Sequence, residues 1–235
     1  MFTHRALFFR ANISELKLNY HCMNNITFPA SAMPDADWWR TLWFNPDAVI
    51  RDIGITPTMS VLDLACGDGY FTAAIARQIR PMHVTGFDLD ATMLASAQTY
   101  CNELTNCDWV LGDAMALSQL ITQKMDYVLI ANTFHGVPNQ RELCRQIAQI
   151  LTPTGKLAII NWHDLPREKT MILDQARGPR TELRMSVAQT CAVVESAGFG
   201  LNRVVELLPY HYAAIFSMSD LSLFAETKNQ ACGNP

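Results

Sequence analysis

Two short apolar runs, separated by a glycine loop and a helical pattern, constrain the fold of this chain most. Val61–Leu64 leads into a loop that holds Gly67 and Gly69, and the second run, 84–87, ends at Asp88. A strand, a glycine-rich turn, a helix and an acidic residue at the next strand tip form an arrangement that binds nucleosides. The sequence therefore predicts an α/β fold with a nucleoside site.

Apolar strand patterns alternate with amphipathic helix patterns over most of the chain. We expect strands at residues 60–64, 83–87, 109–111, 127–131 and 157–162. Helices are expected at 47–53, from 71 to before Pro81, at 91–100 and after Asn139, and residues 152–155 are expected to turn into the fifth strand. Continuous apolar strands that alternate with helices are typical of a parallel sheet covered on both faces.

The last part of the domain has a different pattern. Ser186 and Gln189 match a capping box, and Gly198 is placed to end the helix that follows. Two further strands are expected at 204–208 and 212–216. Their connection is too short for a crossover, so this pair should be antiparallel.

Polar residues follow each of the five expected parallel strands, at the edge where open parallel sheets bind ligands. They occur at Asp63 with the loop 65–69, and at 88–90, 112–114, 132–135 and 161–163. A row of carboxylates disfavours phosphate and favours ribose hydroxyls, an adenine amino group or an ammonium. The pattern indicates a nucleoside cofactor without a pyrophosphate.

These motifs resemble those of the class I S-adenosylmethionine-dependent methyltransferases. The resemblance covers about residues 46–218 and is carried by VLDLACGDGYF (61–71), VTGFDLDATML (84–94), GDA (112–114), DYVLIANTFHG (126–136) and LTPTGKLAIINWH (151–163). It implies a Rossmann-like, doubly wound α/β sheet of seven strands in the order 3-2-1-4-5-7-6, with the last strand antiparallel. It also implies S-adenosyl-L-methionine as the cofactor.

The resemblance further implies roles for particular residues. Asp88 would take both ribose hydroxyls, Asp113 the adenine amino group, and Asp63 the methionine ammonium, directly or through water. Leu89 and Met93 would flank the adenine ring. The other expected cofactor residues are Ala65, Cys66, Gly67, Gly69, Ala114 and Asn132.

Three residues near this site have a second interpretation. Ala65 replaces the first glycine of the family loop, which is harmless if its φ is negative. Cys66 is expected to be a small buried filler and not a reactive thiol. Asp90 either caps the helix that follows or contacts the cofactor.

His135 and His163 end neighbouring strands and are the candidate catalytic residues. Histidine titrates near neutral pH, so either one could act as a general base or orient the acceptor. The alternative is that both form a hydrogen-bonded wall of the pocket. Asn161 could orient either histidine, and residues 210–212 either reach the same pocket or lie on a hairpin surface.

Segments outside these motifs are predicted as follows. Residues 1–45 form an N-terminal extension whose Trp38, Trp39 and Trp43 either make an aromatic lid or, as we favour, pack on the sheet. Residues 219–235 form a C-terminal tail, and translation could start at Met1, Met23 or Met33. The arginines at 177, 180 and 184 lie where the family inserts acceptor-binding segments, although a solvated loop is favoured for them.

Composition excludes several classes of protein. The net charge of −4 argues against a nucleic-acid partner, which needs a basic face. Seven cysteines without a C-x-x-C pair predict neither zinc nor disulfides and favour a cytoplasmic location. No apolar run reaches membrane-spanning length, and residues 1–10 lack a signal-peptide core.

The expected reaction is an in-line methyl transfer to a small molecule, without a metal. The 132–135 tip, Asn-Thr-Phe-His, lacks the Asn/Asp-Pro-Pro-Tyr/Phe tetrad of related enzymes that act on base or glutamine amino groups. The acceptor atom and the oligomeric state stay open.

Two alternatives are retained. One is a nicotinamide-dependent oxidoreductase, which would need Gly or Ala where Thr72 stands and would place pyrophosphate beside Asp68. The other is a non-catalytic S-adenosylmethionine-binding regulatory protein.

Overall fold

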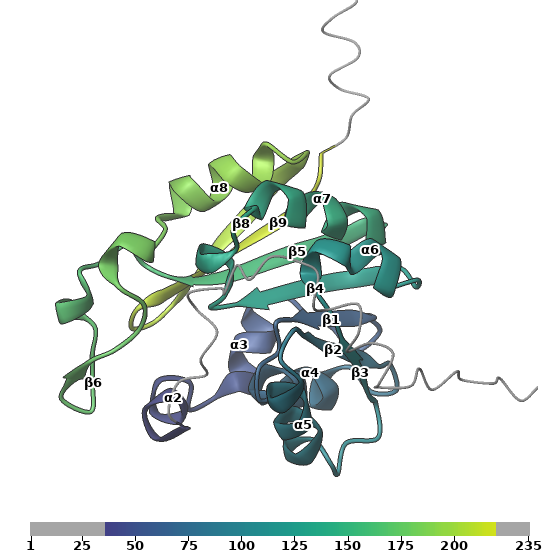
Figure 1. Ribbon diagram of the computed structural model, residues 1–235, viewed down its shortest axis with the longest axis horizontal. Coiled ribbons are helices and arrows are strands. Elements are labelled where there is room, and N and C mark those ends of the chain that lie inside the picture. Colours follow the sequence, from purple (N-terminus) through teal and green to yellow (C-terminus); the bar gives the residue numbers. More distant parts are fainter. Residues whose placement is uncertain (1–35, 220–235) are drawn as a thin grey trace, which may run out of the picture.

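A seven-stranded sheet forms the centre of residues 36–219, which are the residues that the computed structural model describes. In spatial order its strands are β3 (Cys107–Leu111), β2 (Val84–Asp88), β1 (Val61–Leu64), β4 (Met125–Ala131), β5 (Leu151–Trp162), β9 (His211–Met218) and β8 (Phe199–Leu207) (Figure 1). The first five are parallel, and β9 is antiparallel to both β5 and β8. The predicted order 3-2-1-4-5-7-6 is confirmed, because β9 and β8 are the seventh and sixth strands of this sheet.

Helices cover both faces of the sheet (Figure 1). On one face lie α3 (Pro46–Asp52), α4 (Tyr70–Gln78) and α5 (Ala91–Tyr100), and on the other α6 (Leu117–Leu120), α7 (Gln140–Ile150) and α8 (Val187–Glu195). Neighbouring residues of one strand enter different cores: Val61 packs on the first face and Leu62 on the second. Burial on both faces explains why the strands read as continuous apolar runs.

The helix starts follow the predicted capping residues. The side chain of Asn139 accepts a hydrogen bond from the Glu142 amide at the start of α7. Both bonds of the Ser186 and Gln189 capping box are present, at 2.7 and 3.2 Å. Each such cap stabilises its helix by about 1 kcal/mol.

The expected turn at 152–155 was wrong, because β5 already begins at Leu151. Met125 pairs with Leu151, and Tyr127 pairs with Lys156, so residues 152–155 bulge out of the β4 register. A bulge accommodates proline and glycine without ending the strand. The burial of Leu151 at the start of this segment explains why the pairing extends so far.

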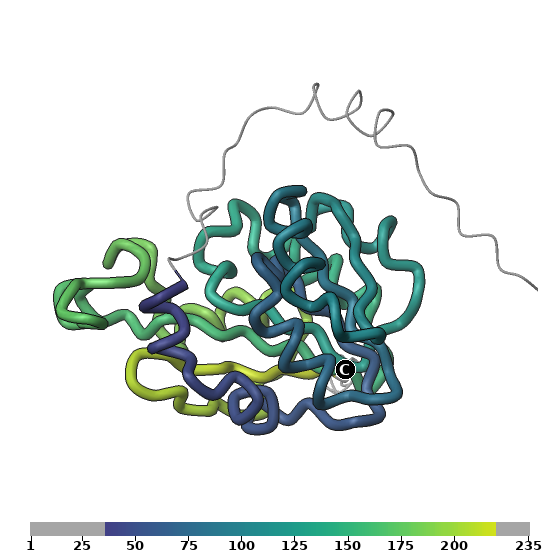
Figure 2. The backbone as a smooth tube through the Cα atoms, turned by 90° about the horizontal axis from the view of Figure 1, so that it is seen from below, coloured from purple at the N-terminus to yellow at the C-terminus, as the bar shows by residue number. Residues whose placement is uncertain are grey.

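An N-terminal helix and an insertion lie together beyond the carboxyl end of β5. The helix is α2 (Ala36–Leu42), and the insertion after β5 contains η4 (Arg167–Lys169), the hairpin β6 (Met171–Ile172) and β7 (Gln175–Ala176), and η5 (Thr181–Leu183). Figure 2 shows purple α2 beside the green insertion, and α2 contacts β6. Trp38, Trp39 and Trp43 are buried in the core here, so packing is what the structure shows for them.

Residues 1–35 and 220–235 lie outside the described part of the chain. The predictions about translation start and most of the C-terminal tail concern those residues. Within 36–219, no helix has both the length and the apolar composition needed to cross a bilayer.

Candidate functional site

The loop 65–69 bends sharply at the carboxyl end of β1. Gly67 and Gly69 have φ values of +56° and +85°, in the left-handed region where glycine is tolerated best. A Cβ on Gly69 would also lie 3.0 Å from the Ala97 Cα of α5. Two glycines are therefore required for this turn and for its close contact with α5.

From the sequence, Ala65 is expected to be harmless if its φ is negative, and the structure does not meet this condition. Its φ is +61°, so the residue that replaces the family glycine also adopts the left-handed conformation. The neighbouring bonds hold it there: the Cys66 amide donates to the Phe87 carbonyl at 3.0 Å, and the Gly69 amide donates to the Cys66 carbonyl at 3.0 Å. Such a conformation costs on the order of 1–2 kcal/mol for alanine. The loop therefore contains local strain.

Asp88 connects the loops that follow β1 and β2. One carboxylate oxygen accepts a hydrogen bond from the Gly67 amide at 2.8 Å, and the other accepts from the Asp90 amide at 2.9 Å. The side chain is largely buried. Each carboxylate oxygen can accept a second bond, so the residue could receive ligand hydroxyls while it holds the loop.

Asp63 is a buried carboxyl without a cationic partner. It accepts a hydrogen bond from the Thr72 hydroxyl at 2.5 Å. Its pKa is raised to about 7, mainly by burial, with the Thr72 bond lowering it and the nearby Asp88 and Asp68 carboxylates raising it. Within residues 36–219 it forms no ion pair with a lysine, arginine or histidine. A bound ammonium would stabilise its ionised form.

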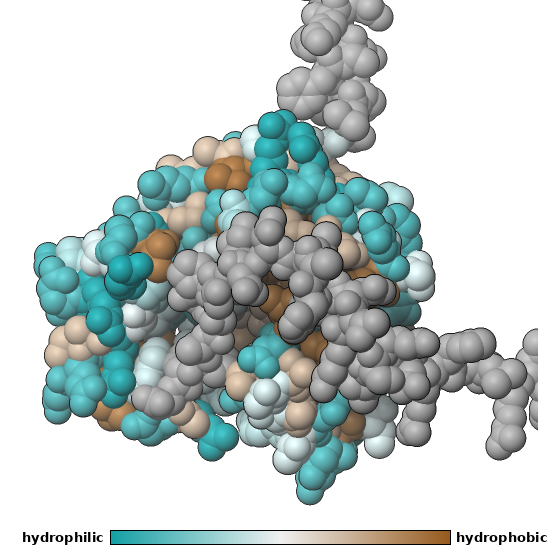
Figure 3. Space-filling view, in the orientation of Figure 1, coloured by the Kyte–Doolittle hydropathy of each residue, from teal (hydrophilic) through white to brown (hydrophobic). Residues whose placement is uncertain are grey.

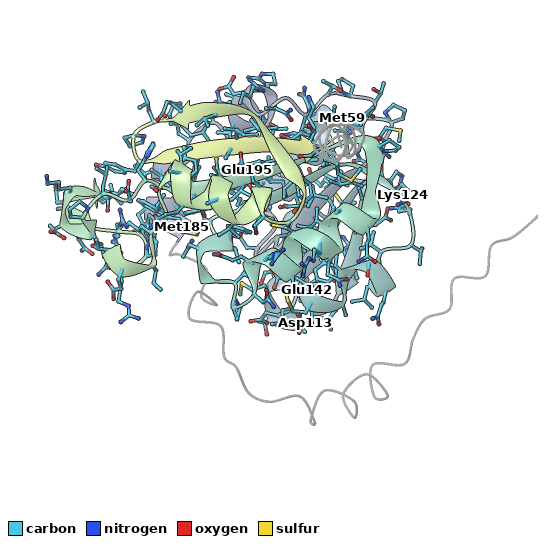
Figure 4. All side chains as sticks on the ribbon, turned by 90° about the horizontal axis from the view of Figure 1, so that it is seen from above. Met59, Asp113, Lys124, Glu142, Met185 and Glu195 are labelled. Atoms are coloured by element: carbon cyan, nitrogen blue, oxygen red, sulfur yellow. The ribbon has the colours of Figure 1, made fainter. Side chains whose placement is uncertain are left out.

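The tips of β2 and β3 carry the residues predicted to hold an adenine ring. Asp113 is exposed and accepts a hydrogen bond from the Met115 amide at 2.9 Å, which caps η2 (Ala114–Ala116) (Figure 4). Leu89 is 51% exposed, and Met93 is half-buried. Ala114 is half-buried too. An exposed leucine beside a half-buried methionine offers apolar surface that a flat ring could cover.

Asp90 and Cys66 have structural partners. Asp90 caps α5 by accepting a hydrogen bond from the Thr92 amide at 2.7 Å, as in the first of its two predicted roles. The Cys66 thiol is buried 3.9 Å from the Gly67 carbonyl oxygen, and burial raises its pKa far above the usual range. A protonated, buried thiol fits the filler role.

Asn132 ends β4 with an unusual backbone and an unpartnered side chain. Its φ is +59°, and its amide N–H donates to the Ile160 carbonyl at 2.8 Å. Both polar atoms of its side chain are buried and have no hydrogen-bond partner among the described residues. Buried amides are almost always bonded, so these atoms are available to a ligand or a water.

His135 lies on η3 (Phe134–Gly136), directly after β4, and is half-buried. Burial lowers its pKa, the nearby Asn161 side chain opposes this change, and the charge of Arg184 lowers the pKa further. The imidazole is therefore neutral near pH 7 and able to accept a proton.

The structure does not pair His163 with His135. The Nε2 atom of His163 lies 2.9 Å from a carboxylate oxygen of Glu206 in β8. Its ring lies 5.2 Å from the Tyr212 ring, centre to centre. These contacts direct His163 toward the edge strand of the sheet.

His211, one of the residues 210–212 predicted either to reach the pocket or to lie on a hairpin surface, is buried. It is 1% exposed, and its ring lies 4.5 Å from Trp43 and 4.1 Å from Trp162. Neither ring nitrogen has a hydrogen-bond partner among the described residues. Burial lowers its pKa well below the usual value, and the charges of His163, Arg184 and His135 add to this effect. The sequence could place His211 at the start of a buried strand. It could not show the contact with Trp43, because Trp43 is remote in sequence.

Arg184 does not lie in a solvated loop, so the favoured interpretation was wrong for this residue. Its side chain is buried, and its guanidinium lies 5.0 Å from the centre of the Trp162 ring. Arg180, by contrast, is exposed and pairs with Glu182 at 3.4 Å. The insertion folds back over β5, which a sequence pattern alone does not reveal.

A surface cavity of about 290 Å³ lies at the opposite edge of the sheet. Its lining includes Pro81, His83 and Asn106, near the amino ends of β2 and β3. It is therefore remote from the predicted cofactor residues. Among residues 36–219, no group of three His, Cys, Asp or Glu side chains is placed to hold a metal ion.

Residues 61–155 match the family model described as a methyltransferase domain. An uncharacterized methyltransferase of Mycobacterium tuberculosis is 32% identical over 129 residues, which are 54% of this chain and 62% of the relative. A demethylmenaquinone methyltransferase of Staphylococcus aureus is 29% identical over 113 residues, 48% of this chain and 46% of that protein. The chain thus covers less than two thirds of the length of these relatives.

Solved structures share the fold. A SAM-dependent methyltransferase from Aquifex aeolicus superposes with a TM-score of 0.67 at 23% identity, over 76% of this chain and 92% of that one. The complex of DhpI with SAH gives a TM-score of 0.59 at 19% identity, over 77% of this chain and 86% of that one. At these identities the likeness shows the fold alone.

Proposed function

We propose that this chain is a class I S-adenosylmethionine-dependent methyltransferase that transfers a methyl group from S-adenosylmethionine to a small-molecule acceptor, since residues 61–155 match a methyltransferase family model and solved methyltransferases share its fold. The observation that carries the proposal is the Asp63 carboxyl, which is buried beside the glycine loop without a cation. A buried carboxylate is costly unless it is paired. The ammonium of the methionine group would supply that pair.

The other cofactor residues surround the same edge of the sheet. In this proposal Asp88 receives the ribose hydroxyls, and Asp113 receives the adenine amino group. Leu89, Met93 and Ala114 border the adenine ring. The loop of Ala65, Cys66, Gly67 and Gly69, together with the unpartnered amide of Asn132, faces the methionine part.

The chain's own contribution to the reaction is alignment. The sulfonium of the cofactor is already a strong methyl donor, so the protein mainly holds acceptor, methyl carbon and sulfur in line. His135 is the better placed general base, because its neutral imidazole follows the end of β4. His163 is the second candidate, but its bond to Glu206 favours an orienting role.

A small molecule is the acceptor class that the chain supports best. The Asn-Thr-Phe-His tip after β4 lacks the tetrad of related enzymes that act on base or glutamine amino groups. One relative is named as a methyltransferase of demethylmenaquinone, which is a small molecule. The charge of −4 further disfavours nucleic acid as a partner. The cysteine pattern supports a cytoplasmic location, and residues 46–218 would form the methyltransferase domain.

The nicotinamide alternative is disfavoured at two points. The Thr72 position, where that class needs a small residue, holds a fully buried side chain bonded to Asp63. A pyrophosphate would also meet the carboxylates of Asp63, Asp68 and Asp88, which act on one another at this edge. A non-catalytic binder would keep the same cofactor residues, so turnover alone separates it from an enzyme.

Calorimetry and a product screen test the proposal. We expect the purified chain to bind S-adenosylmethionine and S-adenosylhomocysteine and to give no heat with NADH. Isotopically labelled S-adenosylmethionine is then incubated with cell metabolite extracts, and a labelled small molecule is expected. Absence of binding by both sulfur nucleosides contradicts the cofactor assignment, whereas binding without S-adenosylhomocysteine production favours the regulatory alternative.

A further inference from the structure

Among residues 36–219, Arg184 is a buried cation without an ion-pair partner. Only 6% of the residue is exposed. Its guanidinium donates to neutral oxygens alone: the Thr170 hydroxyl at 2.9 Å, the Arg177 carbonyl at 3.1 Å and the Pro179 carbonyl at 3.1 Å. Its Nη1 atom is buried and has no partner within residues 36–219.

The neighbouring charges do not neutralise the positive charge of Arg184. Glu168 acts on it from beyond ion-pair distance, and Arg167 adds a charge of the same sign. Contact with the Trp162 ring, 5.0 Å away, compensates part of the cost of burial through a cation–π interaction. A buried cation still needs an anion to offset its desolvation fully.

Aromatic rings surround this cation on the side of α2 and β9. Tyr210 stacks on Trp162 with ring centres 6.2 Å apart and an interplanar angle of 13°. The Trp38 ring lies 6.5 Å from Trp162, and the His211 ring lies 4.1 Å from it. Trp38, Trp162 and His211 are buried against one another, whereas the Tyr210 ring beside them is half-buried. The visible surface around the insertion is mostly hydrophilic (Figure 3), in contrast with these aromatic contacts.

The same charge acts on the proposed reaction centre. Arg184 lowers the pKa of His135 after β4 and the pKa of His211 at the start of β9. Trp162 lies between Arg184 and His211, since its ring centre is 5.0 Å from the guanidinium and 4.1 Å from the His211 ring. A ligand that neutralises Arg184 would lie near the carboxyl end of β5, at the edge of the sheet that also carries His135.

We propose that the acceptor is a planar aromatic compound that carries a carboxylate, held by Arg184 Nη1 and packed against the half-buried Tyr210. This inference rests on the proposed function, because it names the substrate class of that same site. The carboxylate supplies the missing anion, the acceptor ring packs against Tyr210, and the methyl-accepting atom points toward His135. An uncharged acceptor would leave the guanidinium unpaired.

Pairs of probes that differ only in charge test this inference. Benzoate, 2-naphthoate and indole-3-carboxylate are each compared with the corresponding carboxamide. Each probe is titrated into the full chain saturated with S-adenosylhomocysteine, and binding is followed by calorimetry. We expect at least one carboxylate to bind about tenfold or more tightly than its carboxamide, since charge-assisted bonds are the stronger ones.

Substitutions then locate the source of the preference. Arg184→Gln should reduce it to about twofold or less, and Arg184→Lys should retain part of it, because lysine keeps the charge but loses the planar donor geometry. Arg180→Gln is the matched control, since Arg180 is an exposed arginine of the same insertion and should leave the preference unchanged.

Three results would overturn the inference: equal affinity for acids and amides, no binding of any probe, or a preference that survives Arg184→Gln. If Arg184→Gln does not fold, the wild-type comparison and Arg184→Lys decide. Failure of the proposed function itself is recognised separately, as loss of S-adenosylhomocysteine binding by the wild-type chain.

Discussion

The two halves of the proposed active site consist of different types of residue. The cofactor half, at the tips of β1, β2 and β3, consists of carboxylates and a short glycine loop. The acceptor half consists of tryptophans, histidines and Arg184 from α2, β5, the insertion and β9. The first half lies within about fifty residues of sequence, from Asp63 to Asp113, whereas the second joins residues as far apart as Trp43 and His211. The proposed nucleoside site can thus be recognised from a local sequence motif, whereas the proposed acceptor site cannot.

The largest expected effect comes from a substitution that disrupts cofactor binding in the cofactor half. Asp88→Ala should weaken S-adenosylhomocysteine binding by on the order of 10²–10⁴-fold, because it removes two charge-assisted hydrogen bonds to the ribose. It should also cost about 1–2 kcal/mol of folding stability, since the Gly67 amide loses its acceptor. Calorimetry and urea unfolding measure the two quantities. Unchanged binding would refute the ribose role of Asp88.

The raised pKa of Asp63 predicts that the free energy of unfolding depends on pH, and this dependence arises from the cofactor half alone. The folded protein keeps this carboxyl protonated up to about pH 7, whereas the unfolded chain ionises it near its ordinary pKa of 3.8. The unfolding free energy should therefore fall as pH rises from about 4 to 7, by several kcal/mol in total. Asp63→Asn should remove most of this slope in urea titrations, and the exposed Glu103→Gln should leave it in place.

Cofactor binding should change the same equilibrium. A methionine ammonium favours the ionised form of Asp63, so binding near pH 6 should release up to one proton. Calorimetry in buffers of different ionisation enthalpy measures that release. A wild-type chain that binds without proton release, or releases as many protons as Asp63→Asn, would disprove the ammonium assignment.

A substitution of His135 distinguishes the two halves, because it should affect turnover but not cofactor binding. Once an acceptor has been identified, His135→Ala should lower kcat by about 10²-fold as a lost general base, with cofactor affinity changed by about twofold at most. His163→Ala should have a smaller effect, because its ring is held by Glu206 at the edge strand. Full activity of His135→Ala would reduce that residue to a wall of the pocket.

The smallest expected effect concerns the strained loop. Ala65→Gly should stabilise the protein by about 0.5–1 kcal/mol, since glycine relieves the left-handed strain but costs some chain entropy. The exposed helical substitution Ala95→Gly should instead destabilise it by about 1 kcal/mol. Thermal unfolding of both variants provides the comparison. Equal destabilisation by both changes would show that Ala65 is not strained.

The order of the strands and the positions of the helix caps could be predicted from the sequence because they depend on neighbours in the chain. A buried parallel strand has to be apolar on both sides, and a cap such as Asn139 bonds an amide three residues away. The placement of Asp63 and Asp88 at adjacent strand tips follows from the same regularity. The bulge at 152–155 was missed because it depends on pairing with Met125.

The sequence by itself thus determined the sheet, its caps and the row of carboxylates at its edge, because short-range periodicity and strand direction specify them. Only the tertiary structure decided the left-handed φ of Ala65, the burial of His211 between Trp43 and Trp162, and the unpaired Arg184. Those features arise where segments distant in sequence meet. Burial and partner geometry at such contacts depend on the whole fold and leave no periodic pattern in the chain.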